Sequence, residues 1–498
     1  MQKSHCKQLL SSRGICVIIP TYNNAGTIAD VVKRTLEQCD DVIVVDDGCT
    51  DGTDAILREI DGITVVSNTT NKGKGTALKV GFKKALELGF SYAITLDADG
   101  QHYPEDIPLL LDANIKHPGA IIIGQRKLKG VDRSAGSKFA NAFSNFWFCV
   151  QTLHYIPDTQ TGYRLYPLRK MRGLSLLTSR YEAELELLVF AAWHGVKIVP
   201  TEVNVYYPPR EERVSHFRPA LDFTRISILN TVLCVLAVVY GAPLGILRLV
   251  YTVFCTLCSL LIYLIGCLLI NLFAVVYVPL RKLLRLEHNI LPTMLHQFGS
   301  AVCWLLQFGG SKVRVLNKHQ ATLDKPAIII CNHQSHLDLM AHLSLSPKIV
   351  FLTNDWVWRS PFFGFAIRHA GYCPVSEGMD YLKPRLQSLI EQGYSISIFP
   401  EGTRSRDCSI GRFHKGAFQL AEELNVDLLP IVLHGAGKAL PKGGVYMRSH
   451  PITLEITERI TPEQLAQLGT TTLERTKWFR RFYIDKYAEL SNEIEKNV

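Results

Sequence analysis

The stretch YAITLDADGQH, residues 92–102, joins an uncharged apolar run to two aspartates, Asp97 and Asp99. The run predicts a buried strand over residues 92–99, and the glycine at position 100 marks the loop that follows. Two side chains with this spacing do not share one face of a helix. At the end of a strand that opens into a loop, however, both carboxylates can turn toward one cation. The stretch therefore predicts a buried strand that ends in a charged, functional loop.

Short apolar runs alternate with helical patterns on either side of this stretch. We predict strands over residues 15–20, 41–47 and 63–68, and helices over residues 25–39, 53–60 and 75–89. Near-continuous apolar strands that alternate with helices indicate the α/β class, with a parallel sheet covered on both faces. Ligands of such sheets bind beyond the carboxyl ends of the strands. The acidic residues expected at those ends are Asp46, Asp47, Asp97 and Asp99.

The pair Asp97 and Asp99 has the chemistry of a site for Mg²⁺ or Mn²⁺. These cations prefer oxygen ligands and share them with the phosphates of a substrate. A metal held there neutralises the charge that develops on a departing diphosphate. For an isolated pair of this spacing the alternative is a solvated loop, so the surrounding motifs decide between the two interpretations.

Four motifs occur in order: VIIPTYNN (17–24), VVDDGCTDGT (44–53), NKGKG (71–75) and LDADGQH (96–102). Together they resemble family-2 glycosyltransferases of the GT-A fold, especially synthases similar to dolichyl-phosphate mannose synthase. The resemblance covers roughly residues 14–210 and implies a Rossmann-like domain that binds a nucleotide-sugar donor. It implies that Asp97 and Asp99 carry the metal and the diphosphate. The residues that it places at the nucleotide-sugar site are Pro20, Tyr22, Asp46, Asp47, Lys72, Asp97 and Arg164.

The acceptor side of this predicted site depends on QTGYR (160–164) and YEAELELL (181–188). The resemblance implies that Arg164 contacts a phosphate; a surface salt bridge is the alternative. It also implies that Glu182 or Glu184 is a catalytic base if the acceptor is a hydroxyl, which must lose a proton. A lipid phosphate is already ionised and needs no base, and an exposed helix face is the other interpretation of these glutamates. The family's Gln-x-x-Arg-Trp signature of polysaccharide synthases does not occur, which favours transfer of a single sugar.

Residues 226–280 carry a single charge, Arg248, between two long apolar stretches. Each stretch is long enough to cross a bilayer, which takes about 20 residues. Gly241, Pro243 and Gly245 favour a break between them. Basic residues flank the region on both sides, as in the stretch 208–223 and at 281–285, which predicts a transmembrane hairpin with both ends in the cytoplasm. The alternative is that one or both segments lie in the membrane interface or pack against protein.

The stretch NHQSHLD (332–338) contains a histidine and an aspartate five positions apart, His333 and Asp338. An ideal helix would not bring them together. They meet if His333 lies in the turn before a helix and Asp338 in its first turn. The carboxylate would then fix the imidazole tautomer and leave the other nitrogen to accept a hydroxyl proton. For His336 we expect an exposed or capping position.

Beside FPEGTRS (399–405) and LLPIVL (428–433), this pair resembles the glycerolphosphate and lysophosphatidate acyltransferases. The resemblance covers roughly residues 295–460. It implies that His333 is the general base and Asp338 its orienter, with an acyl thioester of coenzyme A or acyl carrier protein as donor. The implied acyl-acceptor site consists of Glu401, Gly402, Thr403 and Arg404. An arginine that usually follows an apolar pair in the family's second block has no counterpart in GYCPVSEG (371–378), so the acceptor is expected to differ from plain glycerol phosphate.

The composition agrees with a multidomain enzyme that works at a membrane. The chain has 498 residues, 47% of them hydrophobic, and a formal net charge of +9. This mild positive charge suits an anionic membrane or phosphorylated substrates, and no motif of a nucleic-acid-binding fold occurs. The 13 scattered cysteines are typical of reduced, buried thiols. We predict a glycosyltransferase domain (1–215), a membrane hairpin (216–290) and an α/β acyltransferase domain (291–498).

Together, these expectations predict a bifunctional membrane enzyme of glycolipid biosynthesis. One part would transfer a sugar to a lipid or amphiphilic acceptor, and the other an acyl group to a hydroxyl. Both catalytic domains would face the cytoplasm at the inner, cytoplasmic membrane. The alternatives are an enzyme with one activity, in which the other half is an anchor or scaffold, and a membrane scaffold without catalysis.

Overall fold

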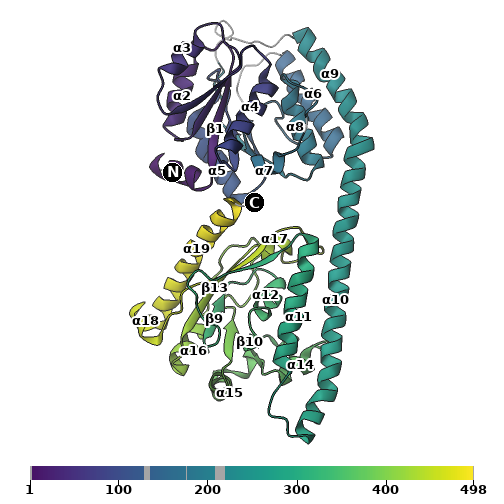
Figure 1. The fold of residues 1–498 in the computed structure, drawn as a ribbon, viewed down its shortest axis with the longest axis vertical. Coiled ribbons are helices and arrows are strands. Elements are labelled where there is room, and N and C mark those ends of the chain that lie inside the picture. The colour runs from purple at the N-terminus through teal and green to yellow at the C-terminus, as the bar shows by residue number, and fades with distance from the viewer. Residues whose placement is uncertain (1–2, 128–134, 175, 208–218, 497–498) are drawn as a thin grey trace. The chain divides into compact units, whose positions relative to one another are not determined.

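The computed structural model of the protein describes residues 3–127, 135–174, 176–207 and 219–496. It divides into two compact units, each with its own sheet. Unit 1 consists of residues Met1–Arg248 and Asn492–Val498, and unit 2 of residues Leu249–Ser491. The colour gradient in Figure 1 follows the chain from the sheet of unit 1, through a long helix, to the sheet of unit 2.

The sheet of unit 1 has the strand order β3-β2-β1-β4-β6-β5-β7. Its strands are β1 (Ile15–Thr21), β2 (Val42–Asp46), β3 (Ile63–Ser67), β4 (Tyr92–Thr95), β5 (Ile121–Arg126), β6 (Arg164–Pro167) and β7 (Ile198–Val203). All neighbouring pairs are parallel except those of β6, which is antiparallel to both β4 and β5. The predicted parallel α/β sheet is confirmed, with β6 as an antiparallel strand that the sequence did not predict.

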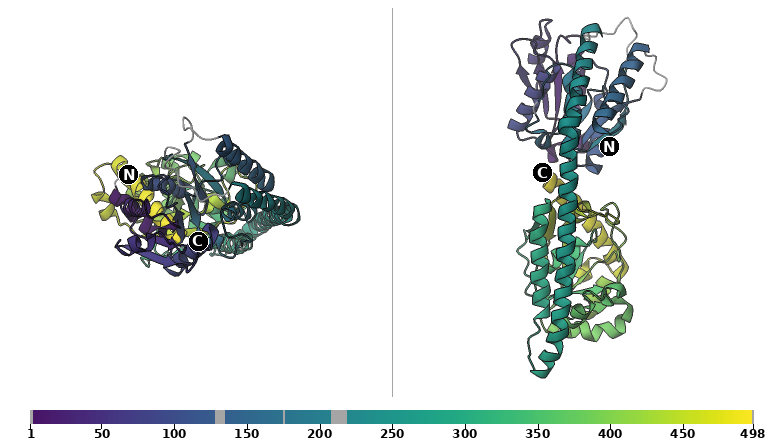
Figure 2. Two further views of the ribbon diagram at one scale, coloured as in Figure 1. Left: turned by 90° about the horizontal axis from the view of Figure 1, so that it is seen from above. Right: turned by 90° about the vertical axis from the view of Figure 1, so that its right-hand side faces the viewer.

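Helices cover both faces of this sheet (Figure 2). They are α1 (Lys3–Ser12), α2 (Ile28–Leu36), α3 (Thr53–Arg58), α4 (Lys74–Glu87), α5 (Ile107–Lys116), α6 (Ala135–Thr152), α7 (Leu168–Met171) and α8 (Glu182–Trp193), with a 3₁₀ turn η1 (Pro104–Asp106). Alternate residues of β1 enter two separate cores. Ile15, Val17 and Ile19 pack with α2 and α5, whereas Cys16 and Ile18 pack with α4 and α8. Burial on both faces explains why these strands are apolar throughout.

The apolar region forms one continuous helix, so the predicted break at residues 241–245 is wrong. It comprises α9 (Pro219–Leu236), a π-helical turn η3 (Ala237–Gly241) and α10 (Ala242–Leu283). Gly241 leaves room for Trp193 of unit 1, since a Cβ atom there would lie 2.7 Å from the indole ring. A π-helical turn directly before Pro243 accommodates the missing N–H and the ring of that proline. All three predicted breakers, Gly241, Pro243 and Gly245, therefore lie within the helix.

Among the described residues, one helix is long and apolar enough to cross a membrane, namely residues Phe223–Leu283. Its most apolar window has a mean hydropathy of 2.6, and 11% of that window is buried. The chain reverses direction later than predicted, after Leu283. The next helix, α11 (Leu291–Leu306), runs back along α10, and the rings of Tyr263 in α10 and Phe298 in α11 are 5.9 Å apart. This region therefore does not form the two membrane crossings on which the predicted cytoplasmic position of both its ends depended. The basic residues 208–218, which we expected to set that orientation, lie outside the described residues.

Unit 2 contains a second mixed sheet, in the order β11-β10-β12-β9-β13-β14-β8. The strands are β8 (Val313–Leu316), β9 (Ile328–Cys331), β10 (Ile349–Thr353), β11 (Cys373–Pro374), β12 (Ser395–Ile398), β13 (Leu428–His434) and β14 (Ile452–Ile456). Only the β13–β14 pair is antiparallel. The second α/β domain is thus confirmed.

The helices of unit 2 pack around this sheet. Besides α11 they are α12 (Leu337–Leu343), α13 (Asp355–Trp358), α14 (Gly364–His369), α15 (Met379–Glu391), α16 (Gly416–Leu424), α17 (Ala436–Ala439), α18 (Pro462–Gln467) and α19 (Thr472–Lys496), with 3₁₀ turns η4 (Gln307–Gly309) and η5 (Val375–Glu377). The buried Tyr483 of α19 donates its hydroxyl proton to the carbonyl of Ile330 in β9. All 13 cysteines are free, as expected.

Candidate active sites of the two units

The two aspartates of LDADGQH lie just beyond the carboxyl end of β4, where the sequence placed them. Lys74, at the start of α4, bridges Asp97 and Glu184: its Nζ is 2.7 Å from Asp97 Oδ1 and 2.9 Å from Glu184 Oε2. The Asp97 side chain is 23% exposed and the Lys74 side chain 18%, so the cluster is reachable from solvent. Three elements that are distant in sequence thus place one cation and two carboxylates at a single point.

The two aspartates of this cluster differ in how readily they ionise. Burial and the negative charge of Asp97 raise the pKa of Asp99 to about 6. Burial also opposes ionisation of Asp97, but Lys74 and His102 outweigh it, and the pKa of Asp97 lies below its ordinary value. Two carboxylates that repel each other gain most from a divalent ion between them. The described residues contain no cluster of three or more acidic, histidine or cysteine ligands, so phosphate oxygens of a donor would have to complete the coordination of a metal.

Gly162 and His102 form the wall behind Asp97, and the sequence did not indicate their role. A Cβ atom on Gly162 would lie 2.4 Å from Asp97 Oδ2. The carbonyl of Gly162 accepts the Thr95 hydroxyl proton at 2.6 Å, which ties this loop to β4. The His102 ring is buried, and its burial lowers the pKa of the imidazole to about 4. The Asp97 carboxylate therefore occupies space that a side chain at position 162 would fill.

We expect Gly162→Ala to reduce sugar transfer by roughly 10–100-fold, because the added methyl group displaces a carboxylate that has to hold its position to within about 0.5 Å. Initial rates with a labelled nucleotide sugar would measure the effect. Gly26→Ala is the matched control, since a Cβ atom there meets nothing within 4 Å. Equal rates for the two variants would contradict the role given to Gly162.

The two aspartates at the carboxyl end of β2, Asp46 and Asp47, make different contacts. The Asp47 carboxylate accepts hydrogen bonds from the backbone N–H of Gly73 at 2.7 Å and of Lys72 at 3.1 Å, and from the Asn68 amide at 2.8 Å. Asp47 therefore shapes the NKGKG loop, while the Lys72 side chain is exposed. Pro20 is buried in β1 and Tyr22 is partly exposed beyond its end.

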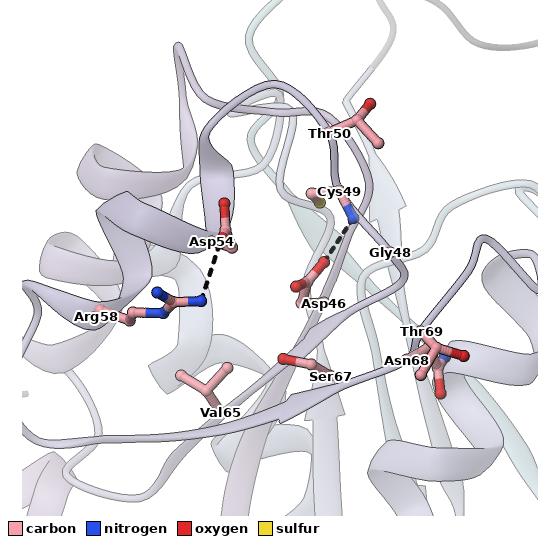
Figure 3. Close-up of a pocket in the computed structure, with 10 residues that line it drawn as sticks. All are labelled: Asp46, Gly48, Cys49, Thr50, Asp54, Arg58, Val65, Ser67, Asn68 and Thr69. Carbon is pink, nitrogen blue, oxygen red and sulfur yellow. Dashed lines mark hydrogen bonds and ion pairs between the residues drawn. The ribbon is translucent and has the colours of Figure 1, made fainter.

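Asp46 lines a separate cavity of about 270 Å³ beside β3 and α3 (Figure 3). Its carboxylate accepts the backbone N–H of Cys49 at 2.9 Å, and Arg58 forms an ion pair with Asp54 one turn earlier in α3, at one side of the cavity. The remaining lining residues are Gly48, Thr50, Val65, Ser67, Asn68 and Thr69. Asp46 thus lines this cavity, whereas Asp47, which lies just past the end of β2, accepts hydrogen bonds from the NKGKG loop and from Asn68.

Arg164 does not reach the surface on which a phosphate would bind. Its side chain is fully buried in β6, and its guanidinium donates to the Tyr166 hydroxyl and to the carbonyls of Glu184 and Thr159. The expected direct contact with a phosphate does not fit this geometry. Arg164 instead acts as an internal cation that helps to lower the pKa of Asp97.

The three glutamates of α8 are buried at its N-terminal end, which excludes the interpretation as an exposed helix face. The Glu184 carboxylate pairs with Lys74. The Glu186 carboxylate accepts the backbone N–H and the hydroxyl proton of Thr178. Glu182, which is 9% exposed, forms no hydrogen bond or ion pair within the described part of the chain. The two candidate bases thus differ: Glu184 is neutralised by a cation, and Glu182 is not.

In unit 2, the side chains of His333 and Asp338 are in contact, as the sequence predicted. His333 lies in the turn between β9 and α12, and Asp338 in the first turn of α12; Nδ1 of the imidazole is 2.8 Å from Asp338 Oδ2. The same carboxylate oxygen accepts the backbone N–H groups of Gln334 and Ser335, which holds the turn. The imidazole stacks on Phe399, with ring centroids 4.3 Å apart, and its side chain is 21% exposed. Nε2 therefore remains available to a substrate proton.

The loop FPEGTRS supports the histidine from the other side. The Glu401 carboxylate accepts the backbone N–H groups of His333 and Gly411, each at 2.9 Å, and the backbone N–H of Ser405 donates to the carbonyl of His333. Glu401 is buried and both of its carboxylate oxygens accept these hydrogen bonds, so its role is to hold the His333 turn in position. Gly402 and Thr403 are exposed and Arg404 is partly exposed, so these three can meet an acceptor.

Lys442 is a residue of this site that the sequence did not indicate. Its Nζ donates to the Thr403 hydroxyl at 2.9 Å and to the carbonyl of Arg404 at 3.0 Å. It follows α17, far from the motifs in sequence, and no short-range pattern could have identified it. Its cation lies directly beside the exposed part of the predicted acceptor loop.

Comparison with known proteins gives a separate result for each half of the chain. The model of glycosyl transferase family 2 matches residues 16–168, and the acyltransferase model matches residues 312–434. The polyprenol monophosphomannose synthase of Mycolicibacterium smegmatis is 35% identical over 216 residues, which are 40% of this chain and 79% of that protein. A chloroplastic 1-acyl-sn-glycerol-3-phosphate acyltransferase of Arabidopsis thaliana is 38% identical over 132 residues, which are 26% of this chain.

The chain spans 37% of the length of that plant acyltransferase and 38% of its relative from Brassica napus. Among solved structures, the 1-acyl-sn-glycerophosphate acyltransferase of Thermotoga maritima aligns with 49% of this chain, and the alignment covers 98% of the Thermotoga chain. The sequence identity is 21% and the TM-score is 0.42. The two matched regions lie on either side of the long apolar helix.

Proposed function

Because the chain belongs to glycosyl transferase family 2 through its N-terminal part and carries an acyltransferase-family domain after it, we propose that it is a bifunctional enzyme of glycolipid synthesis. One site transfers a sugar from a nucleotide-sugar donor to a lipid acceptor. The other transfers an acyl group from a thioester of coenzyme A or acyl carrier protein to a hydroxyl. The observation that carries this proposal is that each unit holds an assembled polar cluster at the carboxyl ends of its strands, around Asp97 and around His333.

For the first reaction we propose Asp97 and Asp99 as the residues that hold Mg²⁺ or Mn²⁺. Such an ion supplies charge neutralisation for the departing nucleoside diphosphate. Asp97 is oriented by Lys74 and by the space at Gly162, so its oxygen atoms are held in place before a ligand arrives. The nucleotide is proposed to lie over Tyr22 and the NKGKG loop, which Asp47 shapes. Asp46 and the exposed Lys72 remain proposed contacts at the edge of this site.

The sugar acceptor is proposed to be a lipid phosphate, as in the polyprenol-dependent relative. A phosphate attacks without losing a proton, so this reaction requires no general base. Glu184 agrees with that requirement, because its carboxylate is held by Lys74 at 2.9 Å and is poorly placed to accept a proton. A hydroxyl acceptor would leave Glu182 as the candidate base.

This choice predicts the behaviour of Glu182→Gln. With a lipid phosphate as acceptor we expect the rate of sugar transfer to fall by less than about tenfold, whereas loss of a general base costs roughly 10²–10⁴-fold. The rate should be measured with a labelled nucleotide sugar and polyprenyl phosphate. A rate loss of the larger size would assign Glu182 as a base and the acceptor as a hydroxyl.

For the second reaction, the structure supports a general-base mechanism. His333 Nε2 takes the proton of the acceptor hydroxyl while its oxygen attacks the thioester carbonyl carbon. The C–O ester bond forms, the C–S bond breaks, and the thiol leaves with the proton that His333 returns. Asp338 holds the Nδ1 proton and thereby keeps Nε2 as the acceptor. Gly402, Thr403 and Arg404 are proposed to contact the acceptor, and Glu401 fixes the loop.

We propose that the enzyme is attached to the cytoplasmic membrane along its long apolar helix without crossing it, so that both sites face the cytoplasm, where nucleotide sugars and acyl thioesters are present. The exposed apolar surface of residues Phe223–Leu283 supports membrane attachment. To test the function, the full-length protein in lipid vesicles should receive a labelled nucleotide sugar, a labelled acyl thioester and a lipid extract. We expect both labels in lipid, with sugar incorporation abolished by a chelator and restored by Mg²⁺ or Mn²⁺. Absence of both labels from lipid would overturn the proposal.

A further inference from the structure

A second cavity lies in unit 2, at the C-terminal end of α10, and no residue of either catalytic cluster lines it. It has a volume of about 350 Å³ and is lined by Val278, Arg281, Lys282, Arg285, Leu286, Asn289 and His369. Three of these residues are permanent or near-permanent cations, and none of the seven is acidic. We propose that this cavity, the α10 basic pocket, binds the phosphate headgroup of an anionic phospholipid. The proposal goes beyond the two transfer reactions and does not depend on either.

The positive charge of the α10 basic pocket is not balanced by the protein. Within the described ranges, Arg281, Lys282 and Arg285 form no ion pair with a carboxylate. The Arg281 guanidinium donates to the carbonyls of Leu286 and Glu287, at 3.1 and 2.9 Å. Stabilisation of a helix C-terminus by a cation therefore accounts for Arg281. It does not account for Lys282 and Arg285, which are left for a ligand.

The backbone presents Arg285 in an unusual way. Its φ angle is +52°, in the left-handed region that favours glycine or asparagine at the end of a helix. The N–H of Leu286 donates to the carbonyl of Arg281 at 3.0 Å, which closes the helix end around this residue. An arginine at such a position carries a conformational cost that a glycine would avoid. Arg285 lines the cavity, and the charge that it brings there is a reason to keep it at this position.

His369 and Asn289 also line the cavity. Asn289 donates to the carbonyl of His369 at 2.7 Å, and His369 Nδ1 lies 2.9 Å from the carbonyl of Phe365. A proton is therefore required on Nδ1, which leaves Nε2 as the second polar atom of the ring. The wall is thus fixed by hydrogen bonds that do not involve Lys282 or Arg285, so the cavity keeps its shape when those two are replaced.

The apolar surface next to the α10 basic pocket identifies the source of the phosphate. Exposed aliphatic side chains recur at every seventh residue of α10, at Leu261, Leu268 and Val275, on the face of the helix that carries Lys282. Each of them is at least 45% exposed. Tyr277 lies in the same turn and donates its hydroxyl proton to the carbonyl of His288, a position typical of side chains at the membrane interface. An acyl chain along this surface and a phosphate in the cavity can belong to one lipid, whereas a soluble phosphate would leave the apolar surface uncovered.

The test compares binding of the full-length protein to vesicles of phosphatidylcholine alone and of phosphatidylcholine mixed with phosphatidylglycerol. We expect tighter binding to the mixed vesicles, and we expect the double variant Lys282→Gln/Arg285→Gln to lose about thirtyfold in affinity for them, about fivefold for each charge removed. Lys477→Gln/Arg481→Gln is the matched control. It removes the same two charges from exposed positions of α19, on another side of unit 2, and should keep wild-type binding (Figure 1).

Two further outcomes decide the assignment. Equal losses for both double variants, or equal binding of the wild type to both kinds of vesicle, would show a diffuse surface charge and overturn the proposal. To separate a lipid headgroup from free phosphate, the thermal unfolding of the detergent-solubilised protein should be followed with inorganic phosphate and with short-chain phosphatidylglycerol. Stabilisation by the lipid that is lost in Lys282→Gln/Arg285→Gln supports the proposal. Equal stabilisation of the wild type by inorganic phosphate would overturn the lipid assignment.

Discussion

Replacement of His333 by alanine is expected to reduce acyl transfer by roughly 10²–10⁴-fold, the usual contribution of a positioned general base. Asp338 fixes Nδ1 of the imidazole at 2.8 Å, which leaves Nε2 to accept the hydroxyl proton. Transfer of a labelled acyl group from acyl-coenzyme A to lipid would measure the loss. Sugar transfer by the same preparation should be unchanged, because unit 1 has its own sheet and core.

His336→Ala is the matched control for this experiment. His336 lies three residues further along the same segment and is exposed. Its imidazole forms no capping hydrogen bond with the first turn of α12. We expect it to retain wild-type acyl transfer. Asp338→Asn should approach the loss of His333→Ala, because an amide can donate to Nδ1 and favour the wrong tautomer. Full activity of His333→Ala would remove the imidazole from the mechanism.

Replacement of Asp97 by asparagine is expected to reduce sugar transfer by roughly 10²–10³-fold, since a divalent ion contributes several kcal/mol to a departing diphosphate and tenfold in rate corresponds to about 1.4 kcal/mol. The substitution keeps the shape beside Gly162 but removes the charge that pairs with Lys74. Asp99→Asn should lose activity to a similar extent. Both variants should need more Mg²⁺ or Mn²⁺ for half-maximal activity, which a metal titration of the initial rate would show.

Asp61→Asn, at an exposed turn before β3, removes the same charge from unit 1 at a distance from the cluster. It should leave the rate and the metal titration unchanged. If Asp97→Asn lowered the rate without moving the metal requirement, the aspartate would act through Lys74 and Glu184, and the metal assignment would be wrong.

Much of the fold follows from local pattern. The strands expected at 15–20, 41–47 and 63–68 are β1, β2 and β3 to within one residue at each end, because a strand buried on both faces is apolar throughout. The expected strand 92–99 ends at Thr95, so Asp97 and Asp99 lie in the loop. The antiparallel direction of β6 has no local signal, since it depends on which strands it joins.

The long helix shows where local rules fail. Gly241 and Pro243 are breakers by propensity, yet tertiary packing of Gly241 against Trp193 and a π-helical turn keep the helix continuous. The sites show the same limit. His333 and Asp338 are close in sequence, so their contact was predictable, whereas the bridge from Lys74 to Glu184 joins residues 110 positions apart. Arg164 was expected at the ligand surface because its motif gives no indication of which way a β6 side chain faces.

The central claim is that one chain carries two independent transfer sites. The most direct measurement supplies the full-length protein in vesicles with a sugar label and an acyl label together, and compares the wild type with Asp99→Ala and with His333→Ala. We predict that Asp99→Ala loses only the sugar label from lipid, and that His333→Ala loses only the acyl label. Retention of both labels in either variant, while the wild type incorporates both, would contradict the account.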